Sequence, residues 1–302
     1  MERILAKVKE GIIGRTVELE SIVLALSAGK HILLEGPPGT SKSTMLRKVA
    51  IEMDLPFYMI EGSIDLVPGK LTGHFDPSKV LAGDFKKEFF IKGPLTKAME
   101  EGGIFYIEEF NRMPADVSNV LISPMEEGEL HIPRYGTVKA AKGFTIIAAQ
   151  NPFDDVGTVR VSRAFMDRIC RIAIGYQSID EEEEIVRYHT DCPEQDLISF
   201  AVQIVRETRK HQEFKLGASV RAAIDLVDMA KQFPLPINRE KFTQIMLMAL
   251  SGKAWLNELS ERTAEDLLKE IQAKVLNTLP QKTFISTSKE TEEDIVKKNS
   301  RS

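Results

Sequence analysis

The feature that most constrains this sequence is GPPGTSKS, residues 36–43, which stands between an apolar run and a helical pattern. The apolar run HILLEG, residues 31–36, ends at a glycine and is typical of a buried strand. The segment SKSTMLRKVAIEM that follows has the periodicity of a helix. A strand, a glycine-rich turn and a helix in this order are the context in which a phosphate-binding loop works.

The segment departs from the loop formula G-x-x-x-x-G-K-[ST] at one position, because Ser41 stands where the formula has glycine. Serine fits there if its φ is negative, whereas a positive φ would cost on the order of 1 kcal/mol and distort the loop. The alternative interpretation is a Gly/Pro turn with Ser41 as the N-cap of the helix. The candidate phosphate-binding residues are Gly36, Pro37, Pro38, Gly39, Thr40, Ser41, Lys42, Ser43 and Thr44.

Within this loop each residue type has a defined task. Backbone N–H groups and the helix N-terminus face the phosphates, and the Lys42 side chain adds a cation. The Ser43 hydroxyl is a candidate ligand of Mg²⁺.

Four more apolar runs predict buried strands, and helical patterns lie between them. This alternation favours a parallel sheet covered on both faces, which is the three-layer αβα arrangement of a P-loop NTPase core. The segment ELHIPRYGTVKAA, residues 129–141, predicts a projecting β-hairpin. The four runs are PFYMIEG (56–62), GIFYIEE (103–109), FTIIAAQN (144–151) and RIAIGY (171–176).

The pattern changes after Tyr176, where strands stop and helical periods follow one another. We therefore predict a nucleotide-binding domain over residues 1–176 and an all-α lid domain over residues 177–280. The polar composition of residues 281–302 predicts a flexible tail.

Composition excludes several classes of protein. The formal net charge of −5 argues against broad, non-specific binding to nucleic acid. The two cysteines, Cys170 and Cys192, have no metal or redox spacing, which fits a reducing, cytoplasmic setting. No apolar run reaches the length of a signal peptide or a membrane span.

A phosphate-binding loop predicts a second strand that ends in acids, and GGIFYIEEFNR, residues 102–112, supplies one. We expect Glu108 to serve the metal and Glu109 to orient or deprotonate the attacking water. Glu108 is one methylene longer than the usual aspartate, and Mg²⁺ tolerates little geometric error. The alternative is a solvated pair of acids at a strand end.

Three further residues complete the candidate site. Asn151 in AAQNP can position the water or contact the γ-phosphate, although Asn-Pro also ends strands in plain turns. An arginine of SRAFMDRI, residues 162–169, can reach the γ-phosphate in a neighbouring subunit, or else pair with a nearby acid such as Asp167. Arg221 in GASVRAA starts a helix of the all-α part and can close over the nucleotide.

The order of these motifs resembles the AAA+ ATPases and, among them, the MoxR family. The resemblance covers roughly residues 5–255 and includes FDPSKVLAGDFKKEFFIKGPL, residues 75–95, which looks like the family's insert. It implies ATP or ADP with Mg²⁺ as ligands. It also implies roles for Lys42 (phosphate), Ser43 and Glu108 (metal), Glu109 (catalysis), Asn151 (first sensor), Arg221 (second sensor) and Arg168 (arginine finger, with Arg163 as the alternative).

MoxR relatives form hexameric rings and are thought to be ATP-driven chaperones. They mature or remodel partner proteins, often ones with von Willebrand A domains or metal cofactors. Two alternatives stay open at this point. One is a DNA-acting AAA+ motor that tracks a backbone through Arg134 and Lys139 of the hairpin. The other is a nucleotide-gated scaffold with little turnover, suggested by Ser41 and Glu108.

Overall fold

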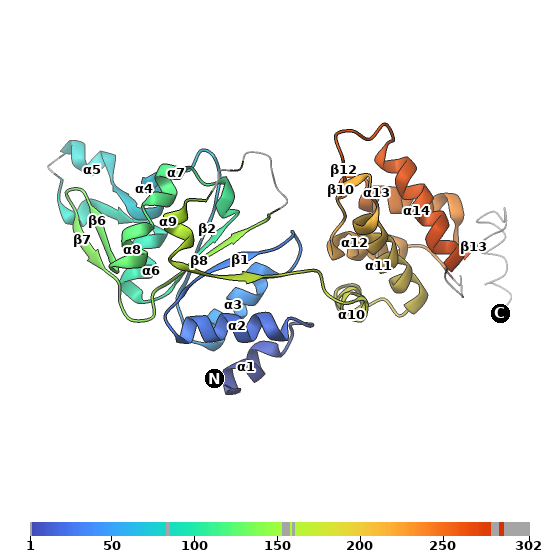
Figure 1. Cartoon of the computed structure of the whole chain (residues 1–302), viewed down its shortest axis with the longest axis horizontal. Helices are drawn as coiled ribbons and strands as arrows, with labels where there is room; N and C mark the ends of the chain where they lie inside the picture. The colour runs from blue at the N-terminus through green and yellow to red at the C-terminus, as the bar shows by residue number, and fades with distance from the viewer. Residues whose placement is uncertain (1, 83–84, 153–157, 159–160, 279–283, 287–302) are drawn as a thin grey trace. The chain divides into compact units, whose positions relative to one another are not determined.

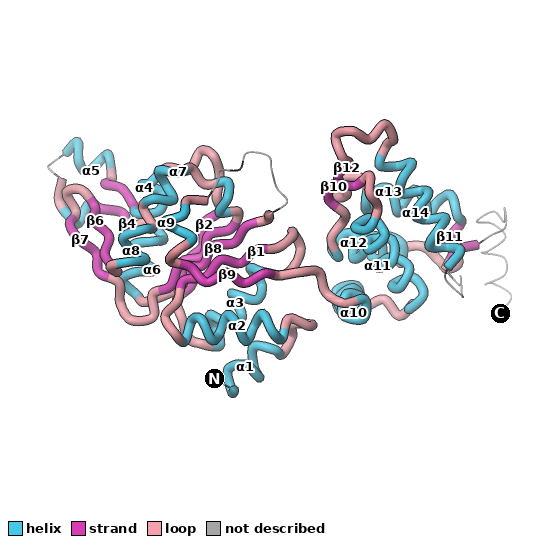
Figure 2. Tube along the Cα trace, viewed as in Figure 1, coloured by secondary structure: helices cyan, strands magenta, loops and turns pink. Residues whose placement is uncertain are grey.

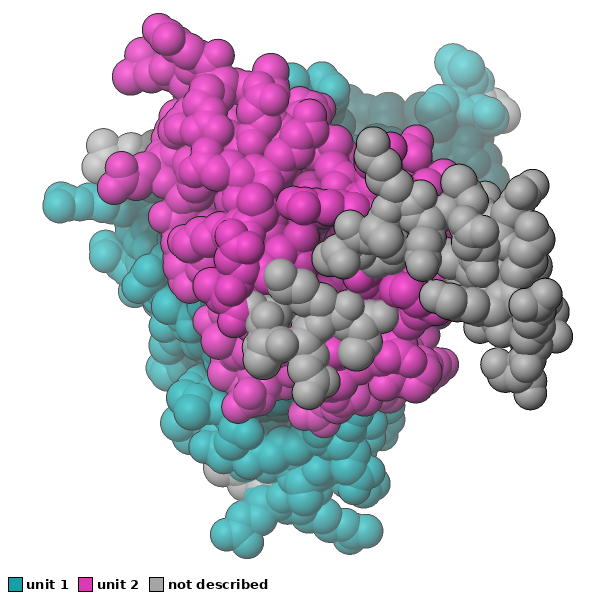
Figure 3. Space-filling model, turned by 90° about the vertical axis from the view of Figure 1, so that its right-hand side faces the viewer, with its two compact units in different colours: residues 1–176 teal, residues 177–302 magenta. Residues whose placement is uncertain are grey.

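The computed structural model describes residues 2–82, 85–152, 158, 161–278 and 284–286 of the 302-residue chain. The chain divides into two compact units, Met1–Tyr176 and Gln177–Ser302. Figure 3 shows the two units in different colours.

The first unit is built on a five-stranded parallel sheet with the strand order β2-β5-β8-β1-β9. Strands β1, β5 and β8 are mostly buried, as a parallel sheet covered on both faces requires. All five predicted strands are confirmed (Figure 2). Their bounds are β1 (His31–Glu35), β2 (Phe57–Glu61), β5 (Ile104–Glu108), β8 (Thr145–Gln150) and β9 (Ile169–Ala173).

Helices cover both faces of this sheet, which confirms the predicted three layers (Figure 1). Alternate residues of β5 face opposite cores, with Tyr106 in one and Phe105 in the other. The Tyr106 side is packed by α1 (Glu2–Lys9), α2 (Thr16–Ser27) and α3 (Lys42–Glu52). The Phe105 side is packed by α4 (Pro68–Thr72), α6 (Pro94–Glu101), α7 (Ala115–Asn119), α8 (Ile122–Glu126) and α9 (Arg163–Met166).

Two antiparallel pairs extend this unit. The predicted hairpin is confirmed as β6 (Glu129–Ile132) paired with β7 (Gly136–Lys139). The insert region adds a pair that periodicity did not predict, β3 (Gly73–Phe75) with β4 (Phe90–Lys92). Between β3 and β4 lie α5 (Pro77–Ala82) and the short helix η1 (Lys87–Phe89). Three-residue strands are too short to display alternation.

The second unit is mainly helical, as predicted. None of the helices in the described part of the chain has the length and apolar character needed to cross a membrane. The helices are α10 (Ile179–Thr190), α11 (Gln195–Lys210), α12 (Val220–Ala230), α13 (Arg239–Leu250) and α14 (Ala264–Thr278).

The expectation that strands stop after Tyr176 is wrong in detail. The second unit contains β10 (Phe214–Leu216) paired with β12 (Trp255–Leu256), and β11 (Ile237–Asn238) paired with β13 (Ile285–Ser286). These strands have two or three residues each, so their sequences carry no strand period.

Part of the predicted tail packs against this unit. Phe284 is fully buried, and its ring lies 5.2 Å from that of Phe200 and 5.5 Å from that of Phe242. The hydrogen bond from the Ile237 N–H to the Phe284 carbonyl, at 2.8 Å, extends the β11–β13 pairing. The rest of residues 281–302, predicted as a flexible tail, lies outside the described residues.

Phe284→Ala is expected to lower the free energy of unfolding of the second unit by about 3–5 kcal/mol, because it removes a buried ring between two others. Urea unfolding followed by circular dichroism measures the change. Leu259→Ala is the control, since Leu259 is 94% exposed, and its expected effect is within about 0.5 kcal/mol. Equal stability of the two variants would show that the Phe284 contact contributes nothing.

Candidate nucleotide-binding site

Three neighbouring strands bring the candidate residues to one edge of the sheet. The loop GPPGTSKS follows β1, Asn151 follows β8, and Glu108 and Glu109 stand at the end of β5. Strand β8 pairs in parallel with both β1 and β5, so all three carboxyl ends point the same way. In open parallel sheets this edge is where ligands bind.

The side chain of Lys42 is hydrogen-bonded to the backbone of its own loop. The Lys42 ammonium donates hydrogen bonds to the carbonyl oxygens of Gly36 and Pro37, both at 2.9 Å. The buried Thr40 hydroxyl donates to the same Pro37 carbonyl at 2.8 Å. A Cβ on Gly36 would lie 2.2 Å from the Ile174 carbonyl oxygen, so only glycine fits there. The ammonium is therefore positioned by the loop backbone.

The backbone of Ser41 has a positive φ. Its φ is 62° and its ψ is 22°, in the left-handed region. Ser41 is the N-cap residue of α3, as the alternative interpretation expected, but its side chain accepts no hydrogen bond from the first turn of the helix. Serine thus occupies a conformation that favours glycine, at a cost on the order of 1 kcal/mol.

A hydrogen bond joins the loop to the acidic strand. The Ser43 hydroxyl donates to Glu108 Oε1 at 2.8 Å and lies 3.3 Å from the Tyr106 hydroxyl. Burial raises the pKa of Tyr106, which keeps its hydroxyl neutral beside the carboxylate. The extra methylene of Glu108 therefore does not prevent contact with the loop.

The residues present fit a nucleotide with Mg²⁺. A hydroxyl and a carboxylate held 2.8 Å apart are the hard oxygen ligands that Mg²⁺ prefers when nucleotide phosphates complete its shell. The first turn of α3 also offers N–H groups that lack acceptors within the helix. Among the residues that the structure describes, no group of three or more His, Cys, Asp or Glu side chains could hold a metal ion. A metal at this site therefore needs the nucleotide phosphates as further ligands.

Glu109 is held in an unusual conformation by its surroundings. Its φ is 51° and its ψ is 44°, which is rare for a residue with a side chain. Its carboxylate pairs with Arg112 at 2.9 Å. A Cβ on Gly62 of the neighbouring chain segment would lie 2.3 Å from the Glu109 carbonyl oxygen. Strain of this kind collects at functional sites, which agrees with a catalytic role for Glu109.

Sequence reasoning missed two members of this cluster. Arg112, at the end of the short helix η2 (Phe110–Arg112), is the partner of Glu109. Asn111 in the same turn donates from Nδ2 to the Asn151 carbonyl at 3.2 Å, which links the ends of β5 and β8. The only available signal was their spacing within EEFNR.

The candidate arginines are carried by other elements. Arg168, between α9 and β9, donates to Glu126 of α8 at 3.2 Å and to the Ala164 carbonyl at 2.6 Å. Its partner acid is thus Glu126 and not Asp167. Arg163 begins α9 and is exposed, and Arg221 is an exposed residue in the first turn of α12 in the second unit. Their roles toward a nucleotide stay predictions.

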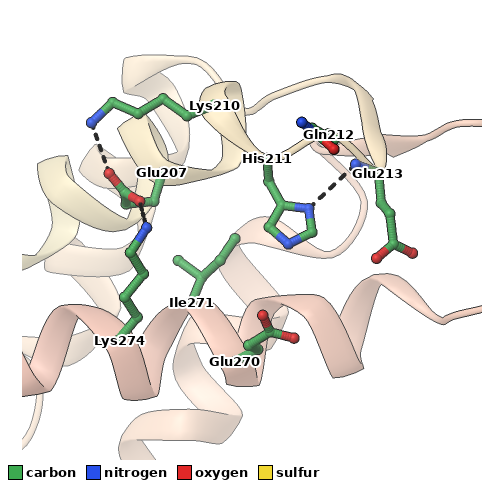
Figure 4. A pocket seen from close by; sticks show the side chains of 8 residues that line it. All are labelled: Glu207, Lys210, His211, Gln212, Glu213, Glu270, Ile271 and Lys274. Atoms are coloured by element: carbon green, nitrogen blue, oxygen red, sulfur yellow. Dashed lines mark hydrogen bonds and ion pairs between the residues drawn. The ribbon is translucent and has the colours of Figure 1, made fainter.

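A pocket of about 320 Å³ lies within the second unit, away from these motifs in the sequence (Figure 4). Its charges satisfy one another, because Glu207 accepts hydrogen bonds from Lys210 at 2.7 Å and Lys274 at 2.5 Å. These two lysines hold the pKa of Glu207 below its usual range. The pocket gathers none of the predicted site residues, so we assign it no ligand.

The fold and the loop define a P-loop nucleotide-binding protein, and comparisons with known proteins agree. Residues 31–169 match the model of the AAA domain (dynein-related subfamily). The chain is 32% identical over 212 residues to an uncharacterised protein of Staphylococcus epidermidis, with 68% of this chain and 80% of that relative covered. The chain therefore belongs to the AAA+ family of ATPases.

Other relatives are more distant. The chain is 30% identical over 217 residues to the gas vesicle ATPase GvpN1 of Halobacterium salinarum, covering 66% of this chain and 61% of that protein. A crystal structure of a Cytophaga hutchinsonii protein, provisionally named an ATPase, has a TM-score of 0.53 at 24% identity and covers 90% of this chain and 93% of its own. A RuvB variant of Thermotoga maritima has a TM-score of 0.51 at 18% identity, covering 89% and 72%. The two structures support the fold.

Ser41→Gly is expected to raise the free energy of unfolding by about 1 kcal/mol, because glycine adopts a positive φ without strain. Ser41→Ala keeps the strain and serves as the matched control, with an expected change within about 0.5 kcal/mol. Chemical denaturation of the three proteins side by side measures both differences. A Ser41→Gly protein less stable than Ser41→Ala would contradict the conformation described for this loop.

Proposed function

We propose that this protein is a Mg²⁺-dependent ATPase that couples ATP binding and hydrolysis to the remodelling or maturation of a partner protein, in the manner of the MoxR family. The hydrogen bond from Ser43 to Glu108 carries the proposal, because it joins the phosphate loop to the acidic strand. The relatives named as ATPases support hydrolysis, and the order of motifs supports the MoxR assignment.

In this proposal the loop binds the phosphates of ATP or ADP through its N–H groups and the Lys42 ammonium. Ser43 and Glu108 would hold Mg²⁺, which neutralises developing charge on the phosphates. Glu109 orients the attacking water and accepts its proton, and Asn151 helps to position that water. Glu109 must leave its ion pair with Arg112 for this step, and because both side chains are partly exposed the pair contributes only about 0–1 kcal/mol.

The trans-acting arginine is assigned to Arg168, with Arg163 as the alternative. Its bond to Glu126 does not prevent this role, because both side chains are partly exposed and such pairs contribute only about 0–1 kcal/mol. A γ-phosphate from a neighbouring subunit can therefore compete with Glu126. Arg221 is proposed to contact the nucleotide from the lid, and the assembly to be a homo-oligomer, a hexameric ring, in the cytoplasm.

The partner is proposed to be a protein, of the kind that includes von Willebrand A domains. A DNA-acting motor is less favoured, because Lys139 of the hairpin pairs with Glu129 at 2.9 Å. The formal net charge of −5 also disfavours a nucleic-acid partner. A nucleotide-gated scaffold is less favoured because Glu108 reaches Ser43.

ATP turnover measured as a function of protein concentration tests the proposal. The specific rate should rise as subunits assemble, because Arg168 acts on a neighbour's nucleotide. Arg168→Ala should slow turnover by about 10³–10⁵-fold, and Glu109→Gln by about 10²–10⁴-fold, while binding of a fluorescent ATP analogue persists in both.

Three results would contradict the proposal. A specific rate of turnover that is independent of protein concentration would contradict the assignment of a trans-acting arginine and of a ring. Unchanged turnover in Glu109→Gln would contradict the assignment of Glu109 as the base. Nucleotide binding with no turnover in the wild type would favour the scaffold.

A further inference from the structure

One surface of the first unit combines exposed cations with aromatic rings. It is formed by the insert between β3 and β4 and by the turn of the β6–β7 hairpin, which lie side by side in Figure 1. The two segments are joined by stacking of Phe90 on Tyr135, with ring centres 4.3 Å apart. We call this the cation–aromatic surface, and its members are Lys79, Lys86, Lys87, Arg134, Phe85, Phe89 and Tyr135.

Each of its four cations lies over an aromatic ring. Lys79 and Lys86 are both 5.8 Å from the centre of the Phe89 ring. Lys87 is 5.9 Å from the centre of Tyr135, and the guanidinium of Arg134 is 3.8 Å from that of Phe85. Contacts of this kind weakly favour positions of the cations over the rings and leave the charges in place.

Among the described residues of this surface and of the insert, cations outnumber acids. Within the described ranges, none of the four cations forms an ion pair with a carboxylate, although all four are exposed. Neighbouring lysines are paired, as Lys92 is with Glu100 at 2.6 Å. The described acids of the insert are Asp76, which accepts from the Ser78 N–H, and the exposed Glu88. A local positive surface on a chain of net charge −5 indicates a specific anionic partner.

The chemistry of the surface favours a peptide over a nucleic acid. The insert and the strand that follows it also expose apolar side chains, with Leu81 90% exposed and Ile91 50% exposed. The faces of Phe85 and Phe89 are covered by cations, whereas proteins that bind single strands present open ring faces to the bases. A partner that matches this surface has carboxylates to bind the cations and apolar side chains to contact Leu81 and Ile91. An acidic, partly apolar polypeptide has both.

We propose that the cation–aromatic surface binds an acidic, extended segment of the protein on which this ATPase acts. The inference rests on the proposed function for the identity of the partner. The binding itself requires neither ATP nor turnover, so it can be measured separately.

The test uses the full chain and a fluorescein-labelled peptide of glutamates interrupted by two leucines, followed by fluorescence anisotropy without nucleotide. The triple variant Lys86→Glu, Lys87→Glu, Arg134→Glu should bind the peptide at least about tenfold more weakly. Wild-type affinity should fall with added salt. The matched control, Lys30→Glu, Lys97→Glu, Lys269→Glu, changes net charge equally at exposed sites elsewhere and should bind like the wild type.

A milder variant distinguishes loss of peptide binding from misfolding. Lys86→Gln with Lys87→Gln removes two charges without reversing them, and should weaken binding in proportion while keeping the thermal midpoint. The inference is overturned if the triple variant binds like the wild type, or if a peptide with lysine in place of glutamate binds equally well. It is also overturned if an oligothymidylate binds more tightly than the peptide and loses its affinity in the same variant.

The two proposals fail in distinguishable ways. Absence of peptide binding in a wild-type protein that hydrolyses ATP would overturn only the present inference. Peptide binding in a wild-type protein that hydrolyses no ATP would overturn only the proposed function. The triple variant should keep the basal turnover of the wild type, because none of its three positions belongs to the nucleotide site.

Discussion

Parallel pairing of β1, β8 and β5 places the carboxyl ends of three strands at one edge of the sheet. The contacts of the nucleotide site that join different strands depend on this register. It brings Ser43, which follows β1, within 2.8 Å of Glu108 at the end of β5. It also places Asn151, at the end of β8, against Asn111 of the turn after β5. Each motif alone is a short stretch of chain, and the sheet turns the three into one site.

Two residues of this site have backbone conformations that disfavour their own side chains. Ser41 in the loop and Glu109 beyond β5 both have positive φ, at 62° and 51°. At Glu109 the conformation lets Gly62 pack against its carbonyl, and the carboxylate pairs with Arg112. At Ser41 no compensating side-chain bond to α3 offsets the strain. Stability is thus reduced where the proposed chemistry takes place, which is a common exchange in enzymes.

Much of this architecture could be predicted from the sequence, because strands such as HILLE are apolar runs that end at recognisable turns. The loop and the acidic pair were recognisable for the same reason, since their chemistry lies in consecutive residues. Contacts between distant residues were not predictable. Nothing local indicates that Arg168 pairs with Glu126, or that Phe284 packs between Phe200 and Phe242. The φ of Ser41 was equally out of reach, because the sequence allows either sign.

The account depends most on Ser43 and Glu108 acting together as the metal-holding pair of a nucleotide site. The affinity of the protein for a fluorescent ATP analogue, measured with Mg²⁺ and again with EDTA, tests this directly in the wild type and in Glu108→Gln. Mg²⁺ should tighten wild-type binding, and Glu108→Gln should reduce that gain by about tenfold or more without changing the affinity in EDTA. An equal gain from Mg²⁺ in both proteins would contradict the assignment.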